Sequence, residues 1–177
     1  DTVLVMGGGP IGMIMLQLAK MAGAAKVFLS EPVQEKRELA LKLGADDVVD
    51  PLTEDVEAFL SARTQNVNCV IECIGRTSTQ EDAIRFAGKG AVVMFFGLVG
   101  PEAQISVKPD VIFSKELTIT SSFINPYTFI RAIDILATGK LDVTSIIAKV
   151  IPLDNITDAF THPDYFRNGK VMIKIAD

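Results

Sequence analysis

Residues that commonly bind metals are scarce in this sequence, which has two cysteines and a single histidine among 177 residues. A catalytic or structural zinc site needs three or four clustered Cys, His, Asp or Glu ligands. His162 lies far along the chain from Cys69 and Cys73, and we find no other clustered set of ligand residues. The sequence therefore predicts no metal site in this chain.

The two cysteines do not favour a disulfide. Both fall in the short apolar run 69–73. Four residues of strand separate two Cα atoms by about 13 Å, whereas a disulfide needs Cα atoms less than about 7 Å apart. Unpaired cysteines are typical of a reducing compartment, so we expect a cytoplasmic protein.

Long apolar runs and clusters of basic residues are also missing. The longest apolar candidate, residues 11–22, is interrupted by Gln17 and Lys20 and is shorter than the roughly 20 residues that cross a bilayer. The chain opens at Asp1 and enters an apolar run at once, without a signal-peptide pattern. Because the net charge is −5, we expect no cationic face for nucleic acid or for an anionic membrane.

Hydrophobic residues make up 49% of the chain, which is enough for a buried core. Residues 3–6 form an uninterrupted apolar run that ends in glycines, as in a central parallel strand covered on both faces. Apolar residues then recur at helical spacing until Gly23 ends the helix. These helical positions are Ile11, Ile14, Met15, Leu18, Ala19 and Ala22.

The same alternation of short apolar runs and helical periods continues to about residue 138. We predict further strands at 26–30, 47–50, 69–73, 91–96 and 117–121. We predict helices around 39–43, 53–63, 79–87 and 127–137, and the long connection 97–114 leaves room for a short strand at 104–107. Strands that alternate with helices indicate an α/β fold with a doubly wound six-stranded parallel sheet, the Rossmann arrangement.

The last part of the chain follows a different pattern. We predict a strand at 144–152, a short helix at 153–160 and a final strand at 169–175. Apolar residues alternate along the final strand, so it should pair with another strand. Because a six-stranded sheet is complete without it, we expect that its natural partner is missing.

Residues 7–12, Gly-Gly-Gly-Pro-Ile-Gly, match the pattern G-x-G-x-x-G between an apolar strand and a helix. Gly7 permits the tight turn, Gly9 lets the backbone approach a pyrophosphate, and Gly12 lets the helix pack closely on the strand. Pro10 suits the first helical position because it has no N–H to leave unpaired. Alone the pattern would also fit an ordinary turn, but this context favours a dinucleotide site at the helix N-terminus.

Glu31 ends the second predicted strand, 19 residues after Gly12. A carboxylate at this place accepts hydrogen bonds from the hydroxyls of the adenosine ribose, and it repels a 2′-phosphate. The sequence therefore favours NAD over NADP, although Lys36 and Arg37 are close enough to weaken that preference. The alternative is that Glu31 is a solvent-exposed charge at a strand end.

Ligands of doubly wound sheets lie outside the carboxyl ends of the strands. This rule places the residues after two predicted strands near the nicotinamide, although a packing role fits the non-glycine residues equally well. The residues concerned are Cys73, Ile74, Gly75 and Arg76 after one strand, and Phe96, Gly97 and Leu98 after the next.

The chain resembles the zinc-containing medium-chain alcohol and polyol dehydrogenases, and among them the sorbitol (L-iditol), butanediol and threonine dehydrogenases. The stretches that carry the resemblance are residues 3–12, Ser30-Glu31-Pro32, residues 43–46, Glu72-Cys73-Ile74-Gly75 and Gly169-Lys170-Val171. The resemblance implies NAD-dependent oxidation of a secondary alcohol to a ketone. It also implies assembly into a homo-oligomer along the edge strand at 117–123.

The resemblance assigns cofactor contacts by position, and it assigns no catalytic residue to this chain. It implies that Glu31 and Lys36 bind the adenosine ribose, that Phe96, Leu98 and the backbone near Ile74 border the nicotinamide, and that Lys170 reaches the pyrophosphate. The remaining pyrophosphate contacts it implies are Gly7, Gly9, Pro10, Ile11 and Gly12.

In the resembling family the zinc ligands and the proton relay come from a preceding catalytic domain. The resemblance therefore implies that residues 1–140 are the dinucleotide-binding domain and that 141–177 is the segment returning to an absent catalytic domain. Such a chain would bind NAD but would not oxidise alcohols, because no Lewis acid would lower the alcohol's pKa. The alcohol or polyol substrate would bind through the absent domain.

Three other functions remain open from the sequence. A methyltransferase also carries an acidic residue after its second strand, but Gly12 at the third motif position argues against it. A non-enzymatic module that senses nucleotides is compatible with every feature above. A zinc-independent quinone reductase that prefers NADPH is disfavoured by Glu31.

Overall fold

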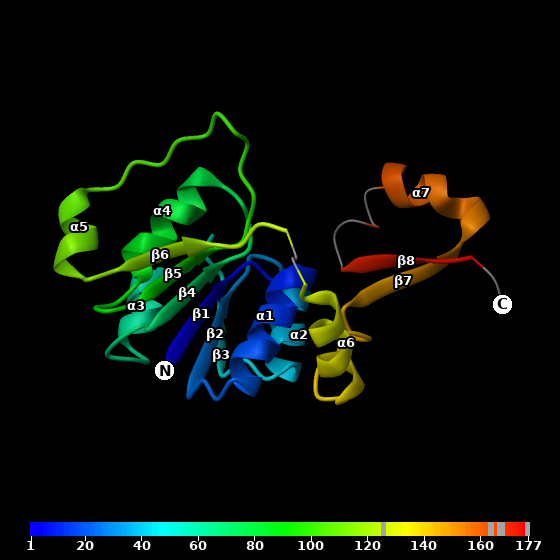
Figure 1. Ribbon diagram of the computed structural model, residues 1–177, viewed down its shortest axis with the longest axis horizontal. Coiled ribbons are helices and arrows are strands. Elements are labelled where there is room, and N and C mark those ends of the chain that lie inside the picture. Colours follow the sequence, from blue (N-terminus) through cyan, green and yellow to red (C-terminus); the bar gives the residue numbers. More distant parts are fainter. Residues whose placement is uncertain (125–126, 163–164, 166–168, 176–177) are drawn as a thin grey trace.

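The computed structural model describes residues 1–124, 127–162, 165 and 169–175. Its main feature is a six-stranded sheet with the order β3-β2-β1-β4-β5-β6 (Figure 1). Every neighbouring pair in this sheet is parallel, so the predicted doubly wound sheet is confirmed. The strands are β1 (Thr2–Met6), β2 (Lys26–Ser30), β3 (Asp47–Val49), β4 (Cys69–Glu72), β5 (Val92–Phe95) and β6 (Thr118–Ser121).

Strand β1 lies at the centre of the sheet, and all five of its residues are buried. Successive side chains of a strand point to opposite faces. Accordingly, Val3 and Val5 pack in one hydrophobic cluster, whereas Leu4 and Met6 pack in another. The uninterrupted apolar run therefore reflects burial on both faces.

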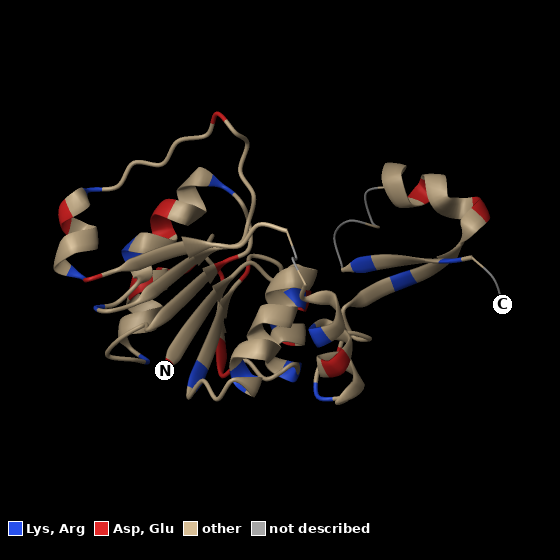
Figure 2. Ribbon diagram, in the orientation of Figure 1, with Lys and Arg blue, Asp and Glu red and all other residues tan. Residues whose placement is uncertain are grey.

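Helices cover both faces of the sheet. The first cluster includes residues of α1 and α2, and the second includes residues of α3 and α4, so each pair covers one face. Figure 2 shows Lys and Arg together with Asp and Glu on the helices taken as a group, whereas the buried strand β1 carries neither. Their bounds are α1 (Pro10–Met21), α2 (Gln34–Lys42), α3 (Val56–Ser61) and α4 (Thr77–Phe86), followed by α5 (Pro109–Ser114) and α6 (Phe129–Ala137).

Two local predictions in this part are wrong. Helix α3 is shorter than 53–63 because Asp55 caps it, accepting hydrogen bonds from the backbone N–H of Glu57 and Ala58. The connection before α5 contains no strand at 104–107, a stretch that the structure describes in full. The side chains of Ile105 and Val107 pack against the core instead, so their alternation reports packing and not strand pairing.

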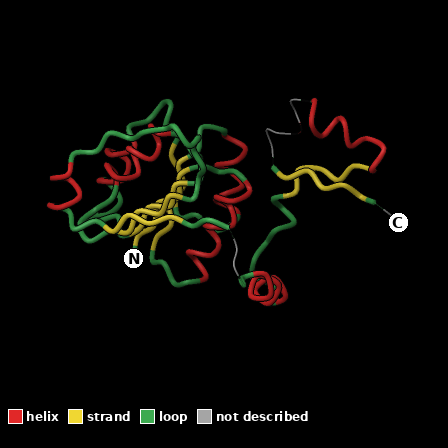
Figure 3. Tube along the Cα trace, turned by 45° about the horizontal axis from the view of Figure 1, so that its top comes forward, coloured by secondary structure: helices red, strands yellow, loops and turns green. Residues whose placement is uncertain are grey.

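The last part of the chain forms a parallel pair of strands, β7 (Ile147–Pro152) and β8 (Lys170–Lys174). The short helices η1 (Leu153–Asn155) and α7 (Ile156–Thr161) connect them, and Figure 3 shows the pair apart from the six-stranded sheet. The prediction that the final strand lacks its partner is therefore wrong. A helical crossover allows two consecutive strands to run parallel, which the alternation alone did not reveal.

Gln17 of α1 attaches the beginning of this last part to the six-stranded unit. Its Nε2 donates to the backbone oxygen of Asp142 at 2.9 Å, and its Oε1 accepts from the Asp142 N–H at 2.7 Å. Gln17 is only 5% exposed, and nearby Ile146 is buried in the same cluster as α1. The polar residue that interrupts the apolar run of α1 therefore has a structural role.

Replacing Gln17 with leucine is expected to lower the free energy of unfolding by about 2 kcal/mol, because both polar backbone groups of Asp142 lose their partner. Urea unfolding followed by circular dichroism measures this change. The exposed Gln34 provides the control, and Gln34→Leu is expected to change stability by less than about 0.5 kcal/mol. Equal effects of the two substitutions would contradict the role of Gln17.

Among the residues that the structure describes, no helix combines the length and the apolar composition that crossing a bilayer requires.

Candidate functional site

The glycine-rich turn connects β1 to α1 at the carboxyl edge of the sheet. Gly7 has a φ of +98°, a backbone conformation that favours glycine, and its N–H donates to the Ser30 oxygen at 2.8 Å. A Cβ on Gly12 would lie 1.8 Å from the Gly7 oxygen. Only glycine allows the helix to approach the turn this closely.

The start of α1 faces open space. Pro10 is the first helical residue, as predicted, and the Met13 N–H donates to the Gly9 oxygen at 3.0 Å. The first turn contains no acidic residue and the helix has no side-chain cap. A Cβ on Gly9 would meet no atom within 4 Å. The positive end of the helix dipole is therefore open to an anion such as a pyrophosphate.

Glu31 lies against this turn and is only 5% exposed. Its Oε2 accepts from the Gly8 N–H at 2.6 Å, and its Oε1 accepts from the Val33 N–H at 3.0 Å. The alternative that Glu31 is a solvent-exposed charge is therefore wrong. Strand β2 pairs with β1 up to Ser30, so the next residue, Glu31, lies against the turn that follows β1. A carboxylate has about four lone-pair sites, so two bonds leave capacity for ligand hydroxyls.

The loop that follows Glu31 is held by Arg37. Its Nη1 donates to the backbone oxygens of Glu31 at 2.7 Å and Pro32 at 2.8 Å, and it pairs with Asp50 at 3.2 Å. These bonds engage Arg37 within the protein. Lys36, in the first turn of α2, is half-buried beside it.

The two predicted nicotinamide loops lie together at the same edge of the sheet. A Cβ on Gly7 would lie 2.7 Å from Cγ1 of Ile74, so the loop after β4 packs on the glycine-rich turn. A Cβ on Gly97 would lie 2.2 Å from the Gly75 nitrogen, so the loop after β5 packs on the loop after β4. Of the other predicted residues there, Phe96 is half-buried and Leu98 is 84% exposed.

A cavity of about 310 Å³ opens beside these loops. Met6, Ser30, Ile74 and Thr79 are among the residues that line it, so it lies at the carboxyl ends of β1, β2 and β4. This is the edge at which doubly wound sheets bind their ligands.

Sequence reasoning did not identify Glu72, the last residue of β4, as a functional candidate. Its side chain is fully buried, and its Oε1 accepts hydrogen bonds from the Ile74 N–H at 2.9 Å, the Gly75 N–H at 2.8 Å and the Thr79 hydroxyl at 2.8 Å. The signal in the sequence is an acidic residue inside an otherwise apolar strand, since a buried charge needs partners.

Cys73 and Cys69 are both free thiols. Burial, with a further contribution from the charge of Glu72, raises the pKa of the Cys73 thiol to about 12. Burial also raises the pKa of Cys69. Cys73 is therefore protonated at neutral pH, which suits it to packing beside the site and not to nucleophilic chemistry.

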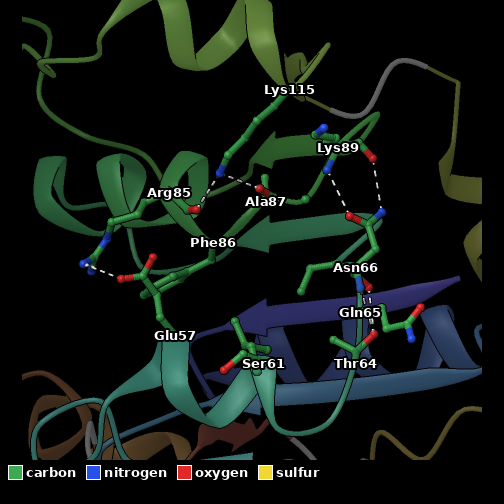
Figure 4. A pocket seen from close by; sticks show the side chains of 13 residues that line it. Glu57, Ser61, Thr64, Gln65, Asn66, Arg85, Phe86, Ala87, Lys89 and Lys115 are labelled. Atoms are coloured by element: carbon green, nitrogen blue, oxygen red, sulfur yellow. Dashed lines mark hydrogen bonds and ion pairs between the residues drawn. The ribbon is translucent and has the colours of Figure 1, made fainter.

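A second groove lies at the opposite edge, next to the amino ends of β4 and β5, and has a volume of about 720 Å³ (Figure 4). Most of its polar side chains bond to one another or to the backbone. Arg85 pairs with Glu57 at 3.2 Å, and Lys115 Nζ donates to the backbone oxygens of Arg85 and Ala87. These contacts connect neighbouring elements and do not gather around a ligand.

The family model that matches this chain is described as zinc-binding dehydrogenase and covers residues 10–138. The chain belongs to the zinc-binding dehydrogenase family. The match runs from the first residue of α1 to the residue after α6.

Relatives confirm the family. L-threonine 3-dehydrogenase of Caldanaerobacter subterraneus is 34% identical over 98% of this chain and 48% of that protein. Scyllo-inosose 3-dehydrogenase of Thermotoga maritima is 31% identical over 99% of this chain and 45% of that protein. This chain therefore spans about half the length of these curated relatives.

Solved structures share this fold. A candidate zinc-binding dehydrogenase of Sinorhizobium meliloti 1021, described as bound to NADP, superimposes with a TM-score of 0.93 and 35% identity over 99% of this chain and 52% of that one. The 2R,3R-butanediol dehydrogenase of Bacillus subtilis gives a TM-score of 0.86 and 25% identity over 99% of this chain and 51% of that one.

Zinc does not fit the described part of this chain. Within residues 1–124, 127–162, 165 and 169–175, no group of three or more His, Cys, Asp or Glu side chains is arranged to hold a metal ion. A zinc ion would need ligands from other residues.

Lys170 is not brought to the glycine-rich turn by any hydrogen bond among the described residues. It is the first residue of β8, and its backbone N–H donates to the Ile146 oxygen at 3.0 Å. Its contact with the pyrophosphate stays a prediction.

His162 follows α7, and its ring meets the Tyr165 ring edge-on with 5.5 Å between centroids.

Proposed function

We propose that this chain binds NAD as the cofactor-binding part of a zinc-dependent alcohol or polyol dehydrogenase, which oxidises a secondary alcohol to a ketone. The main support is the hydrogen bond from the Gly8 N–H to Glu31 Oε2. This bond holds a carboxylate that would accept the ribose hydroxyls next to a helix N-terminus that would bind the pyrophosphate. Bound NAD would supply the ring that accepts the hydride.

The adenosine half of NAD would be held on the turn side of the site. Glu31 and Lys36 would bind the ribose hydroxyls. The pyrophosphate would lie over the open space at Gly9, where a side chain would obstruct it. Its contacts would be Gly7, Gly9, Pro10, Ile11 and Gly12, with Lys170 as the proposed basic partner.

The nicotinamide half would lie against the two loops that pack on each other. Ile74 and Gly75 would present their backbone to the ring, with Cys73 packed behind them. Phe96, Gly97 and Leu98 would border it from the neighbouring loop, and the exposed side chain of Leu98 is available to cover a ligand.

Catalysis would require residues beyond those described. We propose that 1–140 is the cofactor domain and that 141–177 returns to a catalytic domain that supplies the zinc ligands and the proton relay. The coverage of about half of each relative supports this division. The chain by itself would then bind NAD without oxidising alcohols.

A homo-oligomer through β6 is the proposed assembly. All four residues of β6 are exposed, and the strand lies at the edge of the sheet. An uncovered edge strand offers its backbone groups for pairing with another strand.

The choice of cofactor tests the proposed function. Titration calorimetry with NAD and NADP is expected to show NAD binding at least about tenfold tighter, because the Glu31 carboxylate opposes a 2′-phosphate. The NADP described for the Sinorhizobium meliloti relative makes this comparison informative. Tighter binding of NADP would overturn the role of Glu31, and binding of neither nucleotide would overturn the proposed function.

A further inference from the structure

Glu72 is a buried acidic residue that the proposed contacts with NAD do not use. Its carboxylate is completely inaccessible to solvent. Burying a charge costs a large free energy unless hydrogen bonds or an opposite charge compensate it. Among the described residues no Lys or Arg forms a salt bridge with Glu72, so its compensation comes from hydrogen bonds.

These hydrogen bonds converge on one oxygen. Oε1 accepts from the backbone N–H groups of Ile74 and Gly75 and from the hydroxyl of Thr79. Oε2 is buried and has no hydrogen-bond partner in the described part of the chain. The carboxylate thus fixes the conformation of the loop after β4 through one oxygen, while its second oxygen accepts no hydrogen bond from the described residues.

Glu72 also contacts the second nicotinamide loop. Its backbone oxygen accepts from the Phe96 N–H at 2.9 Å and from the Gly97 N–H at 2.8 Å. A Cβ on Gly97 would lie 2.7 Å from Oε2, so this loop lies directly on the carboxylate. One residue therefore holds both loops, through its side chain and its main chain.

The two loops also leave each other little freedom. Gly75 has a φ of +81°, and a Cβ there would lie 2.5 Å from the Leu98 oxygen. The arrangement depends on close backbone packing that a small shift of either loop would break. Hydrogen bonds from two successive amides to one charged oxygen are a strong way to prevent such a shift.

We propose that Glu72 is a positioning residue for the nicotinamide half of the cofactor. It does not touch the ligand, and it acts by holding the amides of Ile74 and Gly75 where the ring binds. This inference rests on the proposed binding of NAD. It predicts that Glu72 matters for the nicotinamide half and not for the adenosine half.

The experiment compares NADH with ADP-ribose, which keeps the adenosine and the pyrophosphate but lacks nicotinamide. The dissociation constants of both are measured for the 177-residue chain and for Glu72→Leu and Glu72→Gln. Glu72→Leu is expected to weaken NADH at least about tenfold, because hydrogen bonds to a charged acceptor are lost. ADP-ribose is expected to stay within about twofold, because its contacts lie around Gly9 and Glu31. Glu72→Gln retains an acceptor oxygen and is expected to recover most of the NADH affinity.

Two measurements keep the test valid if Glu72→Leu does not fold. Thr79→Val removes one of the three bonds to Oε1 and is expected to weaken NADH alone, by about threefold. Amide hydrogen exchange at Ile74 and Gly75, without ligand, is expected to be faster in Thr79→Val than in the unchanged chain, because Oε1 loses one of the bonds that fix it. Asp134→Asn, an exposed acidic residue of α6, is the control for loss of a negative charge.

Each outcome decides the inference. Selective loss of NADH affinity together with faster exchange at the two amides supports it. Equal losses for NADH and ADP-ribose, or no loss for either, would overturn it while leaving the proposed function intact. If ADP-ribose and NADH both fail to bind the unchanged chain, the proposed function itself is wrong, and this inference is overturned with it.

Discussion

Replacing Gly12 with alanine is expected to lower the free energy of unfolding by about 3 kcal/mol, because the added methyl group overpacks a closed contact. The new Cβ would lie 1.8 Å from the Gly7 oxygen and 3.6 Å from a methyl group of Val5. Helix α1 would have to move away from the turn, so NAD binding should be lost as well. Urea unfolding and calorimetry measure the two effects.

Gly9→Ala separates binding from folding. Its Cβ would meet nothing within 4 Å, so stability should change by less than about 1 kcal/mol. NAD affinity should nevertheless fall about 100-fold, because the methyl group occupies the approach to the pyrophosphate. Gly100→Ala, where a Cβ also meets nothing, should change neither quantity. Full NAD affinity in Gly9→Ala would refute the placement of the pyrophosphate.

Glu31→Ala is expected to weaken both NAD binding and folding. It should weaken NAD by about 1–3 kcal/mol, because the ribose loses hydrogen bonds to a charged acceptor. It should also lower the free energy of unfolding by about 2 kcal/mol, because the amides of Gly8 and Val33 lose their acceptor. Calorimetry and urea unfolding report the two losses separately.

The neighbouring acidic residue Glu38 serves as the control for Glu31. It is exposed on α2 and accepts a hydrogen bond only from Gln34 in the described contacts, so Glu38→Ala should leave NAD affinity unchanged. Glu31→Ala should also narrow the preference for NAD over NADP, because the negative charge opposing the 2′-phosphate is gone. If Glu31→Ala lowers stability but keeps NAD affinity, Glu31 supports the loop and does not bind the ribose.

Glu31 and Glu72 occupy similar places on either side of the glycine-rich turn. Glu31 follows β2 and Glu72 ends β4, and both of these strands pair with β1. Both carboxylates are buried, and each accepts hydrogen bonds from backbone amides of the loop that follows its strand. The three loops that would surround the cofactor are therefore fixed by two carboxylates. We expect rigid loops of this kind to favour binding, because less conformational entropy is lost when the ligand arrives.

The sequence by itself determined the order of the six strands along the chain and the helices that alternate with them, except α5, which lies in the predicted connection 97–114. The apolar run at residues 3–6, the helical spacing after it and the glycines at element ends are local signals. Each reflects a regular backbone geometry with a fixed side-chain period, so it is readable without knowledge of distant residues. The glycine-rich motif and the position of Glu31 were found in the same way.

Only the tertiary structure decided which distant residues meet. The burial of Glu31 follows from where β2 ends beside β1, and the role of Glu72 follows from the packing of two loops that are separated by helix α4. The pairing of β7 with β8 and the contact of Gln17 with Asp142 likewise join residues far apart in the chain. The periodicity of a sequence shows which face of a helix or strand is apolar. These contacts depend instead on how complete elements pack against one another, and a local sequence pattern carries no information about that packing.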